Sequence, residues 1–168
     1  MKKQKGFSLI ELLIVVAIIL IIAAIAIPNL MRSKMAANEA SAVGTVRTVN
    51  TAEVTYSSAW GIGYAADLVS LGSSAAGACT ATSTNACLID NVLTSGNKSG
   101  YVFTAAGTLA NNGVNNGFES NAHPVTVGQT GQRAFCSDQS GVIRQDTTGA
   151  LTSVAAGACA AVTTVLGN

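Results

Sequence analysis

The sequence has few of the residues from which catalytic and metal-binding sites are usually built. Only 10% of its 168 residues are charged, 5% are aromatic, and His123 is the single histidine. No C-x-x-C pair accompanies that histidine, which disfavours a zinc site. Serine and threonine are abundant, but none stands in a G-x-S-x-G elbow, and neither a P-loop nor a dinucleotide fingerprint is present. The sequence therefore offers no residues on which an enzyme mechanism can rest.

An excess of charge of one sign is also missing. Nine basic and eight acidic residues give a formal net charge of +1. Three of the basic residues are Lys2, Lys3 and Lys5, so a chain without them would carry six basic against eight acidic residues, a net charge of −2. Neither form has a basic patch of the kind that binds nucleic acid or anionic lipid. No nucleic-acid partner is expected.

What the chain does have is a long apolar run near its start. Within residues 7–27 only Ser8 and Glu11 are polar. As a helix this segment would be roughly 31 Å long, which matches the hydrocarbon thickness of a bilayer. The lysines lie on one side of it only. This asymmetry predicts that the N-terminus stays in the cytoplasm and that the rest of the chain is exported.

Glu11 is an exception in this apolar run, because a carboxylate near the centre of a bilayer costs roughly 2.5 kcal/mol or more. No partner for it is evident within the run. One interpretation is that Glu11 lies near the helix end and reaches the lipid headgroups. The other is that it pairs with a cation supplied by another molecule. Cleavage after Gly6 would create such a cation, the α-amino group of Phe7.

The residues from Gly6 to Leu13, Gly-Phe-Ser-Leu-Ile-Glu-Leu-Leu, resemble the class III leader of type IV pilins and type II secretion pseudopilins. The resemblance implies that residues 1–6 are a leader, that prepilin peptidase cleaves after Gly6, and that Phe7 is then N-methylated. It also implies that Glu11 neutralises the Phe7 amine of a neighbouring subunit during filament assembly. Pro28 falls where many members of the family have a helix-kinking proline.

By this resemblance the protein is a structural subunit, a pilin that polymerises into a type IV pilus-like extracellular filament. The alternative within the family is a major pseudopilin that forms a periplasmic pseudopilus. The implied partners are other copies of the chain, prepilin peptidase, and an inner-membrane assembly platform with minor pilins. The precursor would cross the inner membrane once, and the mature protein would lie in a cell-surface filament or a periplasmic pseudopilus.

A different reading treats the apolar run as an ordinary secretory signal. Ala24-Ile25-Ala26 is an A-x-A pattern, and cleavage there would leave a secreted or anchored binding domain that begins at Ile27. The run is longer than a usual signal core of about 7–15 residues, and such cores rarely contain a glutamate. The filament interpretation is therefore favoured.

After Pro28 the pattern becomes amphipathic, and residues 28–60 are predicted to continue the helix. Apolar residues recur three or four apart at positions 36, 40, 43, 46, 49, 52 and 56. This spacing predicts one helix from Phe7 to about Ala59 that is bent or locally melted near Pro28. The second half presents one apolar face, which must pack on a domain. Gly61 and Gly63 are suitable residues for its end.

Beyond the helix, the sequence predicts a connecting loop over residues 61–97 and an antiparallel sheet domain with a C-terminal loop over residues 98–168. The loop contains a short helix from Asp67 to Leu71 and another over 86–93. The sheet signals are strands at 100–104, 118–122 and 125–127, turns at 111–113 and 115–117, and a hairpin of 132–136 with 142–146. The fold class is therefore α+β, a long helix packed on a small antiparallel sheet.

Four cysteines lie in the exported part, where an even count predicts two disulfides. Three connectivities are possible. Cys79–Cys87, which closes a short loop, and Cys136–Cys159, which fastens the C-terminus, are favoured. The second resembles the disulfide-bounded C-terminal region of type IVa pilins.

No cofactor is expected apart from a possible calcium ion, since G-type pseudopilins bind calcium in their sheet loops. The carboxylates of Asp90, Glu119, Asp138 and Asp146 are oxygen ligands of the kind calcium prefers. Of these, Asp138 and Asp146 are the candidates. Their spacing is not diagnostic, and carboxylates solvated in turns are the better interpretation.

Overall fold

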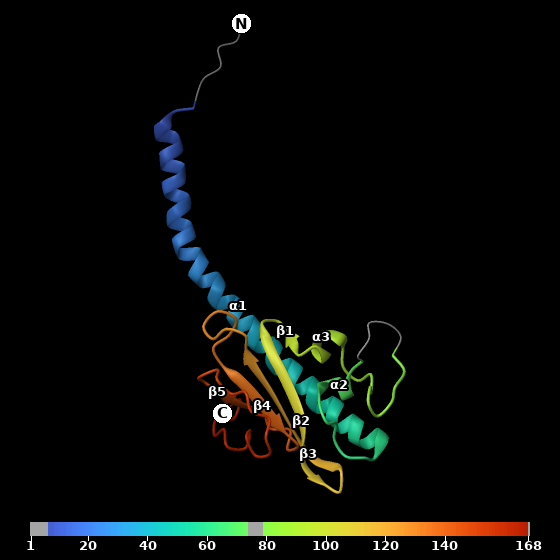
Figure 1. Cartoon of the computed structure of the whole chain (residues 1–168). Helices are drawn as coiled ribbons and strands as arrows, with labels where there is room; N and C mark the ends of the chain where they lie inside the picture. The colour runs from blue at the N-terminus through green and yellow to red at the C-terminus, as the bar shows by residue number, and fades with distance from the viewer. Residues whose placement is uncertain (1–6, 74–78, 168) are drawn as a thin grey trace. The chain divides into compact units, whose positions relative to one another are not determined.

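The structure of the chain, a computed structural model, describes residues 7–73 and 79–167 (Figure 1). Its elements are α1 (Leu9–Trp60), α2 (Leu68–Leu71), α3 (Asn91–Thr94), β1 (Asn97–Lys98), β2 (Tyr101–Asn111), β3 (Val114–Pro124), β4 (Ala134–Asp138) and β5 (Arg144–Asp146). The chain divides into two compact units, Met1–Lys34 and Met35–Asn168. The predicted α+β arrangement is confirmed.

The first unit contains the apolar part of α1. Its large apolar side chains are exposed on every side of the helix, from Phe7 and Leu9 through Ile27 to Met31. The helix is long and apolar enough to cross a membrane. It is continuous through Pro28, so the predicted local melting at this residue is not observed. Proline has no N–H, and the carbonyl of Ala24 therefore receives no backbone hydrogen bond from this position.

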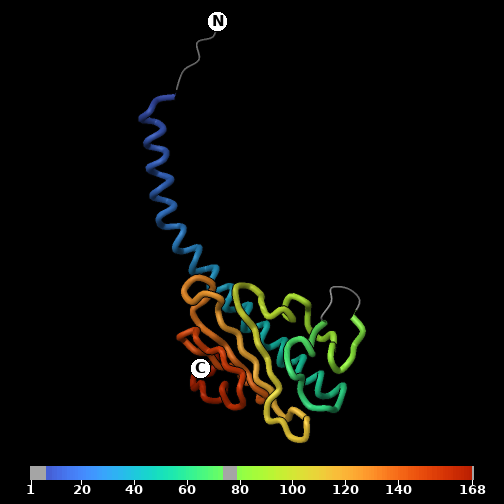
Figure 2. The backbone as a smooth tube through the Cα atoms, viewed as in Figure 1, coloured from blue at the N-terminus to red at the C-terminus, as the bar shows by residue number. Residues whose placement is uncertain are grey.

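In the second unit, the amphipathic half of α1 packs on a five-stranded sheet. Figures 1 and 2 show this part of the helix running along one face of the sheet. The strand order is β1-β2-β3-β4-β5 and every pair is antiparallel. The helix contributes Ala42, Val46, Val49, Ala52 and Tyr56 to the core, all of them buried. Val46, Val49, Ala52 and Tyr56 belong to the stripe that the periodicity predicted, but Ala42 does not, and the stripe positions 36 and 40 are exposed. The helix ends one residue beyond the expected position.

The core between helix and sheet is closed by aromatic residues from the strands. Tyr101, Phe103 and Phe135 are at most 3% exposed and join the core from β2 and β4. Burying a large apolar side chain of this size contributes about 1.5–3 kcal/mol. The Tyr101 hydroxyl is also satisfied, because it donates a hydrogen bond of 2.8 Å to the carbonyl oxygen of Arg133.

The opposite face of the sheet is polar and is covered by the C-terminal segment, defined here as residues 147–167. Asn121 and Glu119 of β3, both at most 3% exposed, lie on this face. Asn121 Nδ2 donates to the Ser153 carbonyl at 3.0 Å, and the Cys159 backbone N–H donates to Glu119 Oε2 at 2.9 Å. The side chains of buried strand residues therefore meet main-chain groups of the segment above them.

Three local expectations are wrong. Residues 115–117 do not form a turn, because Asn112-Gly113 already reverses the chain and Val114 starts β3. Residues 125–127 do not form a strand, since the chain leaves the sheet after Pro124 and Val125 N–H donates to the Gly100 carbonyl instead. The helix expected over 86–93 is limited to α3, because its cap is Asp90, whose carboxylate accepts the Leu93 N–H at 2.6 Å.

The other local expectations hold or need extension. Asp67 caps α2 as expected, with its carboxylate accepting the Ser70 N–H at 2.8 Å. β4 and β5 form the expected hairpin, but β4 extends to Asp138 and β5 starts only at Arg144, so residues 142 and 143 belong to the connection. Strand β2 extends well beyond the predicted residues 100–104 and reaches Asn111.

Candidate functional site

The strongest candidate site is the start of α1, where Glu11 lies among exposed apolar side chains. Glu11 Oε2 accepts a hydrogen bond of 2.9 Å from the backbone N–H of Ser8. The Leu12 N–H in turn donates to the Ser8 carbonyl at 3.3 Å. Ser8 therefore sits at the N-terminal boundary of the helix and Glu11 three residues later, the spacing of a capping box.

This contact is a partner for Glu11 that the sequence interpretation missed. The signal was present, because Ser8-Leu9-Ile10-Glu11 follows the S-x-x-E pattern of a helix start. A carboxylate at this place is also favoured by the helix dipole, whose positive end lies at the N-terminus. Within residues 7–73 and 79–167, the Ser8 N–H is the hydrogen-bond donor to this carboxylate, and it bonds to Oε2 and not to Oε1. One oxygen is therefore bound to its own helix and the other is available.

The remaining residues proposed for this site are described only in part. Phe7 is 78% exposed and precedes the helix. Gly6, the residue before the proposed cleavage, lies outside the described residues, as do the lysines before it. Pro28 is within α1, nineteen residues after the first helical residue, Leu9. The structure thus brings Phe7, Ser8 and Glu11 together at one helix end and leaves Pro28 apart from them.

A charged cluster fastens α1 to the sheet. Glu39, 8% exposed, accepts the backbone N–H groups of Gln132 and Arg133 at 2.9 and 3.1 Å. The guanidinium of Arg133 donates to Glu39 Oε2 from both Nε, at 2.9 Å, and Nη2, at 2.7 Å. Burial alone would raise the pKa of Glu39, but these hydrogen bonds and the arginine charge outweigh it and lower the pKa. The cluster is structural, because both oxygens of the Glu39 carboxylate accept hydrogen bonds from other residues of the chain.

A second buried carboxyl group lies near the end of α1. Glu53 is fully buried, and its Oε2 accepts the Ala65 backbone N–H at 2.9 Å. Its Oε1 is buried and has no partner among the described residues. Burial raises the pKa of Glu53 to about 7, opposed by the Ala65 hydrogen bond and assisted by the negative charge of Asp67. Because Ala65 lies in the connection to α2, Glu53 holds that connection against the helix.

The cysteines form two disulfides. Cys79 joins Cys87 with a Cα–Cα distance of 6.0 Å, and Cys136 joins Cys159 at 5.6 Å. This is the pairing that the sequence favoured. The second bond links β4 to the C-terminal segment next to the Glu119 hydrogen bond. The first bond instead joins two positions of the connecting loop, because neither Cys79 nor Cys87 lies in a helix or strand.

The carboxylates proposed for calcium are used in turns and caps. Asp138 Oδ1 accepts the Ser140 N–H at 2.8 Å, and Asp146 Oδ2 accepts the Thr148 hydroxyl at 2.6 Å. Burial alone would raise the pKa of Asp146, but hydrogen bonds from Thr148, Ala150 and Leu151 outweigh it and lower the pKa. The described residues contain no group of three or more His, Cys, Asp or Glu side chains placed to hold a metal ion. Both carboxylates thus stabilise the turns that follow their strands, but Asp138 is only 7% exposed, so the expectation of a solvated carboxylate is wrong for this residue.

The other calcium candidates, Asp90 and Glu119, are engaged elsewhere. Asp90 forms an ion pair of 2.9 Å with Lys98. The hydrogen bond that Lys98 donates in this pair, together with the one from the Leu93 N–H, lowers the pKa of Asp90. His123 does not join any of these groups. Burial lowers its pKa, and its Nδ1 is buried without a partner among the described residues.

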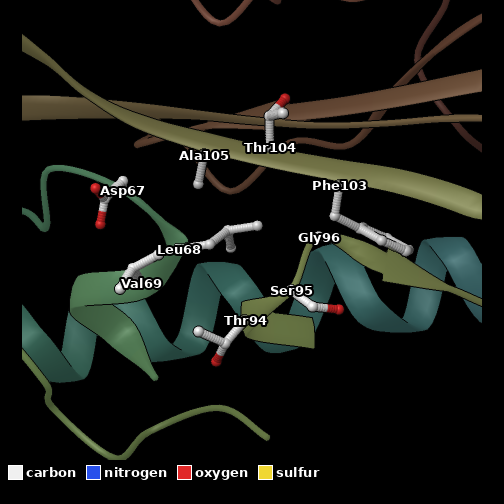
Figure 3. A pocket seen from close by; sticks show the side chains of 9 residues that line it. All are labelled: Asp67, Leu68, Val69, Thr94, Ser95, Gly96, Phe103, Thr104 and Ala105. Carbon is white, nitrogen blue, oxygen red and sulfur yellow. The ribbon is translucent and has the colours of Figure 1, made fainter. Parts of the chain in front are cut away.

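A shallow hollow of about 240 Å³ lies between α2, the end of α3 and β2 (Figure 3). Its lining residues are Asp67, Leu68, Val69, Thr94, Ser95, Gly96, Phe103, Thr104 and Ala105. Figure 3 shows the Leu68 and Phe103 side chains between the strand and the short helices. Asp67 is the single charged residue, and its carboxylate already caps α2. The residues that line the hollow therefore do not indicate a binding or catalytic site.

Comparisons with known proteins agree with the geometry of the helix start. Residues 1–27 match the family model described as the prokaryotic N-terminal methylation motif. The type IV wide pilus major component PilA4 of Thermus thermophilus is 59% identical over 39 residues, which are 23% of this chain and 30% of that protein. The match thus spans less than a third of the length of that relative. No solved structure matches the chain. Both likenesses are confined to the N-terminal segment of the chain, which is similar to that of type IV pilins and pseudopilins.

Proposed function

We propose that this chain is a structural subunit that polymerises into a type IV pilus-like filament through the apolar part of α1. The observation that carries the proposal is the available oxygen of Glu11 at the start of a helix whose apolar side chains are exposed on every side. Such a helix must be surrounded, by lipid in the precursor and by other helices in the filament.

Processing would provide the partner of Glu11. Prepilin peptidase would remove residues 1–6 by cleaving after Gly6, and the freed Phe7 amine would be N-methylated and remain cationic. Glu11 Oε2 is held by the Ser8 N–H, which fixes the carboxylate in place, and Oε1 would accept the Phe7 amine of the adjacent subunit. This pair would set the axial register of the subunits. Removing one partner of such a desolvated pair costs about 3–5 kcal/mol.

The rest of the chain would form the filament surface, and Pro28 would provide the point at which α1 bends during assembly, since one backbone hydrogen bond is already missing there. The precursor would be anchored in the inner membrane, with assembly requiring a membrane platform and minor pilins. The role is structural, and we propose no catalytic function.

The test is the substitution Glu11→Ala in cells that lack the wild-type subunit. We expect normal cleavage, measured as the mass of the N-terminal peptide, and a loss of filaments, measured by shearing and electron microscopy. Ile10→Ala is the matched control, because it shortens a neighbouring exposed side chain without a change in charge. Normal filaments from Glu11→Ala would overturn the ion pair as the assembly device.

The alternative roles are separated by the location and the mass of the mature chain. Sheared cell-surface fibres that contain this chain with methylated Phe7 at its start support a pilus. The same mature chain found only in the periplasm supports a pseudopilus. A mature chain beginning at Ile27 would instead support a secreted binding domain and overturn the filament proposal.

A further inference from the structure

The hairpin between β2 and β3 ends in a two-residue turn of Asn112 and Gly113. Asn111 pairs with Val114, and the two turn residues have φ values of 51° and 80°. Two residues with positive φ are the mark of a type I′ turn, for which Asn-Gly is the preferred sequence. The yellow end of the hairpin in Figure 2 is this turn.

The Asn112 side chain and the Gly113 backbone N–H are both accessible at this turn. Asn112 and Gly113 are exposed, and no described residue forms a hydrogen bond with the Asn112 side chain or with the Gly113 N–H. A methyl group built on Gly113 would meet no atom within 4 Å. The Asn112 carboxamide and the Gly113 amide nitrogen are therefore next to each other in the chain, with no neighbouring group restricting their approach.

The end of this hairpin is also easy to open. Strand β4 pairs with residues 119–122 of β3, so residues 108–117 form a two-stranded ribbon without a third strand. The connection before α2 contacts this ribbon at Asn115, which forms an isolated β-bridge with Gly63. The Tyr64 N–H donates to the Asn115 carbonyl, and Asn115 Nδ2 donates to the Tyr64 carbonyl. Residues 111–114 lie beyond this contact and pair only with each other among the described residues, and such hairpin ends open locally at low cost.

A second Asn-Gly pair in the same ribbon has the opposite environment. Asn116 Nδ2 donates to the carbonyls of Leu109, at 3.2 Å, and Val114, at 3.4 Å. Gly117 is buried and pairs with Thr108, and a methyl group built on it would lie 3.0 Å from Leu109 and Thr108 side-chain atoms. The same dipeptide thus occurs once without hydrogen bonds from the described residues to its reacting groups, and once with the asparagine amide hydrogen-bonded and the glycine paired in the sheet.

We propose that Asn112 is a site of spontaneous deamidation and that Asn116 is protected. The Gly113 nitrogen, after losing its proton to solvent base, attacks Asn112 Cγ and forms a C–N bond while ammonia leaves. Water then opens the resulting succinimide at either carbonyl and gives aspartate or isoaspartate. The net change is one water consumed and one ammonia released, with no other reactant.

The modification would change the end of the hairpin in two ways. It adds a negative charge at a place that has none, since the ribbon from 108 to 117 contains no charged residue. As isoaspartate it also inserts a methylene group into the main chain, which is incompatible with a two-residue I′ turn. Older copies of the protein would therefore carry a more acidic and looser hairpin end.

The test is incubation of the full-length protein in mildly alkaline buffer prepared with ¹⁸O-water. Trypsin releases both Asn-Gly pairs in one peptide, Ser99 to Arg133, and electron-transfer fragmentation locates the ¹⁸O and distinguishes isoaspartate from aspartate. We expect at least about tenfold more label at Asn112 than at Asn116, because local opening governs access. The rate should rise with pH, because the attacking nitrogen must be deprotonated.

Variants provide the controls. Asn112→Gln should remove the label, because the longer side chain places the carboxamide out of reach for a five-membered ring, and Asn116→Gln should leave the Asn112 label unchanged. Equal label at both positions of the wild-type chain would overturn the proposal, as would label at Asn116 alone or at neither. The wild-type comparison does not depend on how the variants fold.

Discussion

At the scale of single residues, Glu53 should make the stability of the folded domain depend on pH. Its pKa is raised from the ordinary 4.5 to about 7 by burial. The folded state therefore keeps a proton that the unfolded chain releases. The contribution of Glu53 to the free energy of unfolding should therefore be fully present below pH 4.5, fall between pH 4.5 and 7, and be lost above that. The total loss should be roughly 3 kcal/mol, from about 1.4 kcal/mol per pKa unit.

Glu53→Gln should remove this decline, because an amide does not titrate. The measurement is urea unfolding of the full-length protein in detergent solution at pH 5 and pH 8. Glu39→Gln is the matched control. The pKa of Glu39 is lowered, so its contribution is present above pH 4.5 and is lost as the pH falls further, and its variant should keep the decline towards pH 7. An unchanged decline in Glu53→Gln would show that another group titrates.

At the scale of elements, the two disulfides should differ in what they stabilise. Cys136 and Cys159 are 23 residues apart, and Cys79 and Cys87 are 8 apart. The loop-entropy model gives about 3 kcal/mol for the longer loop and slightly less for the shorter. Replacing Cys136 and Cys159 by alanine should also release the C-terminal segment, since it loses the anchor beside Glu119.

Limited proteolysis followed by mass spectrometry measures that release. Cleavage within residues 147–167 should appear early in the Cys136→Ala, Cys159→Ala double variant. The Cys79→Ala, Cys87→Ala double variant should retain the protection of this segment. If both double variants are cleaved there at the same rate as the wild-type protein, the hydrogen bonds to the sheet alone hold the segment.

The elements also show what the sequence could predict. The stripe through Val46, Val49 and Ala52 has helical spacing, so α1 and most of its buried face were predictable from periodicity. The hairpin of β4 and β5 was predictable from its turn residues. The length of β2 was not, because most of its last residues are small or polar, and they become a strand only by pairing with β3. Tertiary pairing there overrides local preference.

The site was predictable to a similar extent. The apolar run, Glu11 and the leader pattern are local, so the sequence displays them directly. The Glu39–Arg133 cluster joins residues 94 positions apart, and a single sequence contains no signal for such a pair. The burial of Glu53 could not be predicted from the sequence either, because it depends on where the chain after Gly63 folds back.

At the scale of the whole molecule, the apolar part of α1 should decide whether the protein is found in the membrane fraction or in the soluble fraction. The large apolar side chains from Phe7 to Ile27 are mostly more than half exposed, which water does not tolerate over such a length. The full-length chain expressed in bacteria should therefore stay with the membrane fraction after an alkaline carbonate wash. A variant lacking residues 7–27 should appear in the soluble fraction. Release of the full-length chain by carbonate would contradict a membrane-spanning helix.

Apart from the Cys136–Cys159 disulfide, the cover over the polar face of the sheet is held by hydrogen bonds to its main-chain atoms. Asn121 bonds to the Ser153 carbonyl, Glu119 to the Cys159 N–H, and Arg144 Nη1 donates to the Val162 carbonyl at 3.2 Å. Peptide groups are the same in every residue type, so substitutions among the outward side chains of this cover leave its anchorage intact. The outward side chains of this surface can thus vary in sequence without loss of its attachment to the sheet, provided that the path of the backbone is kept.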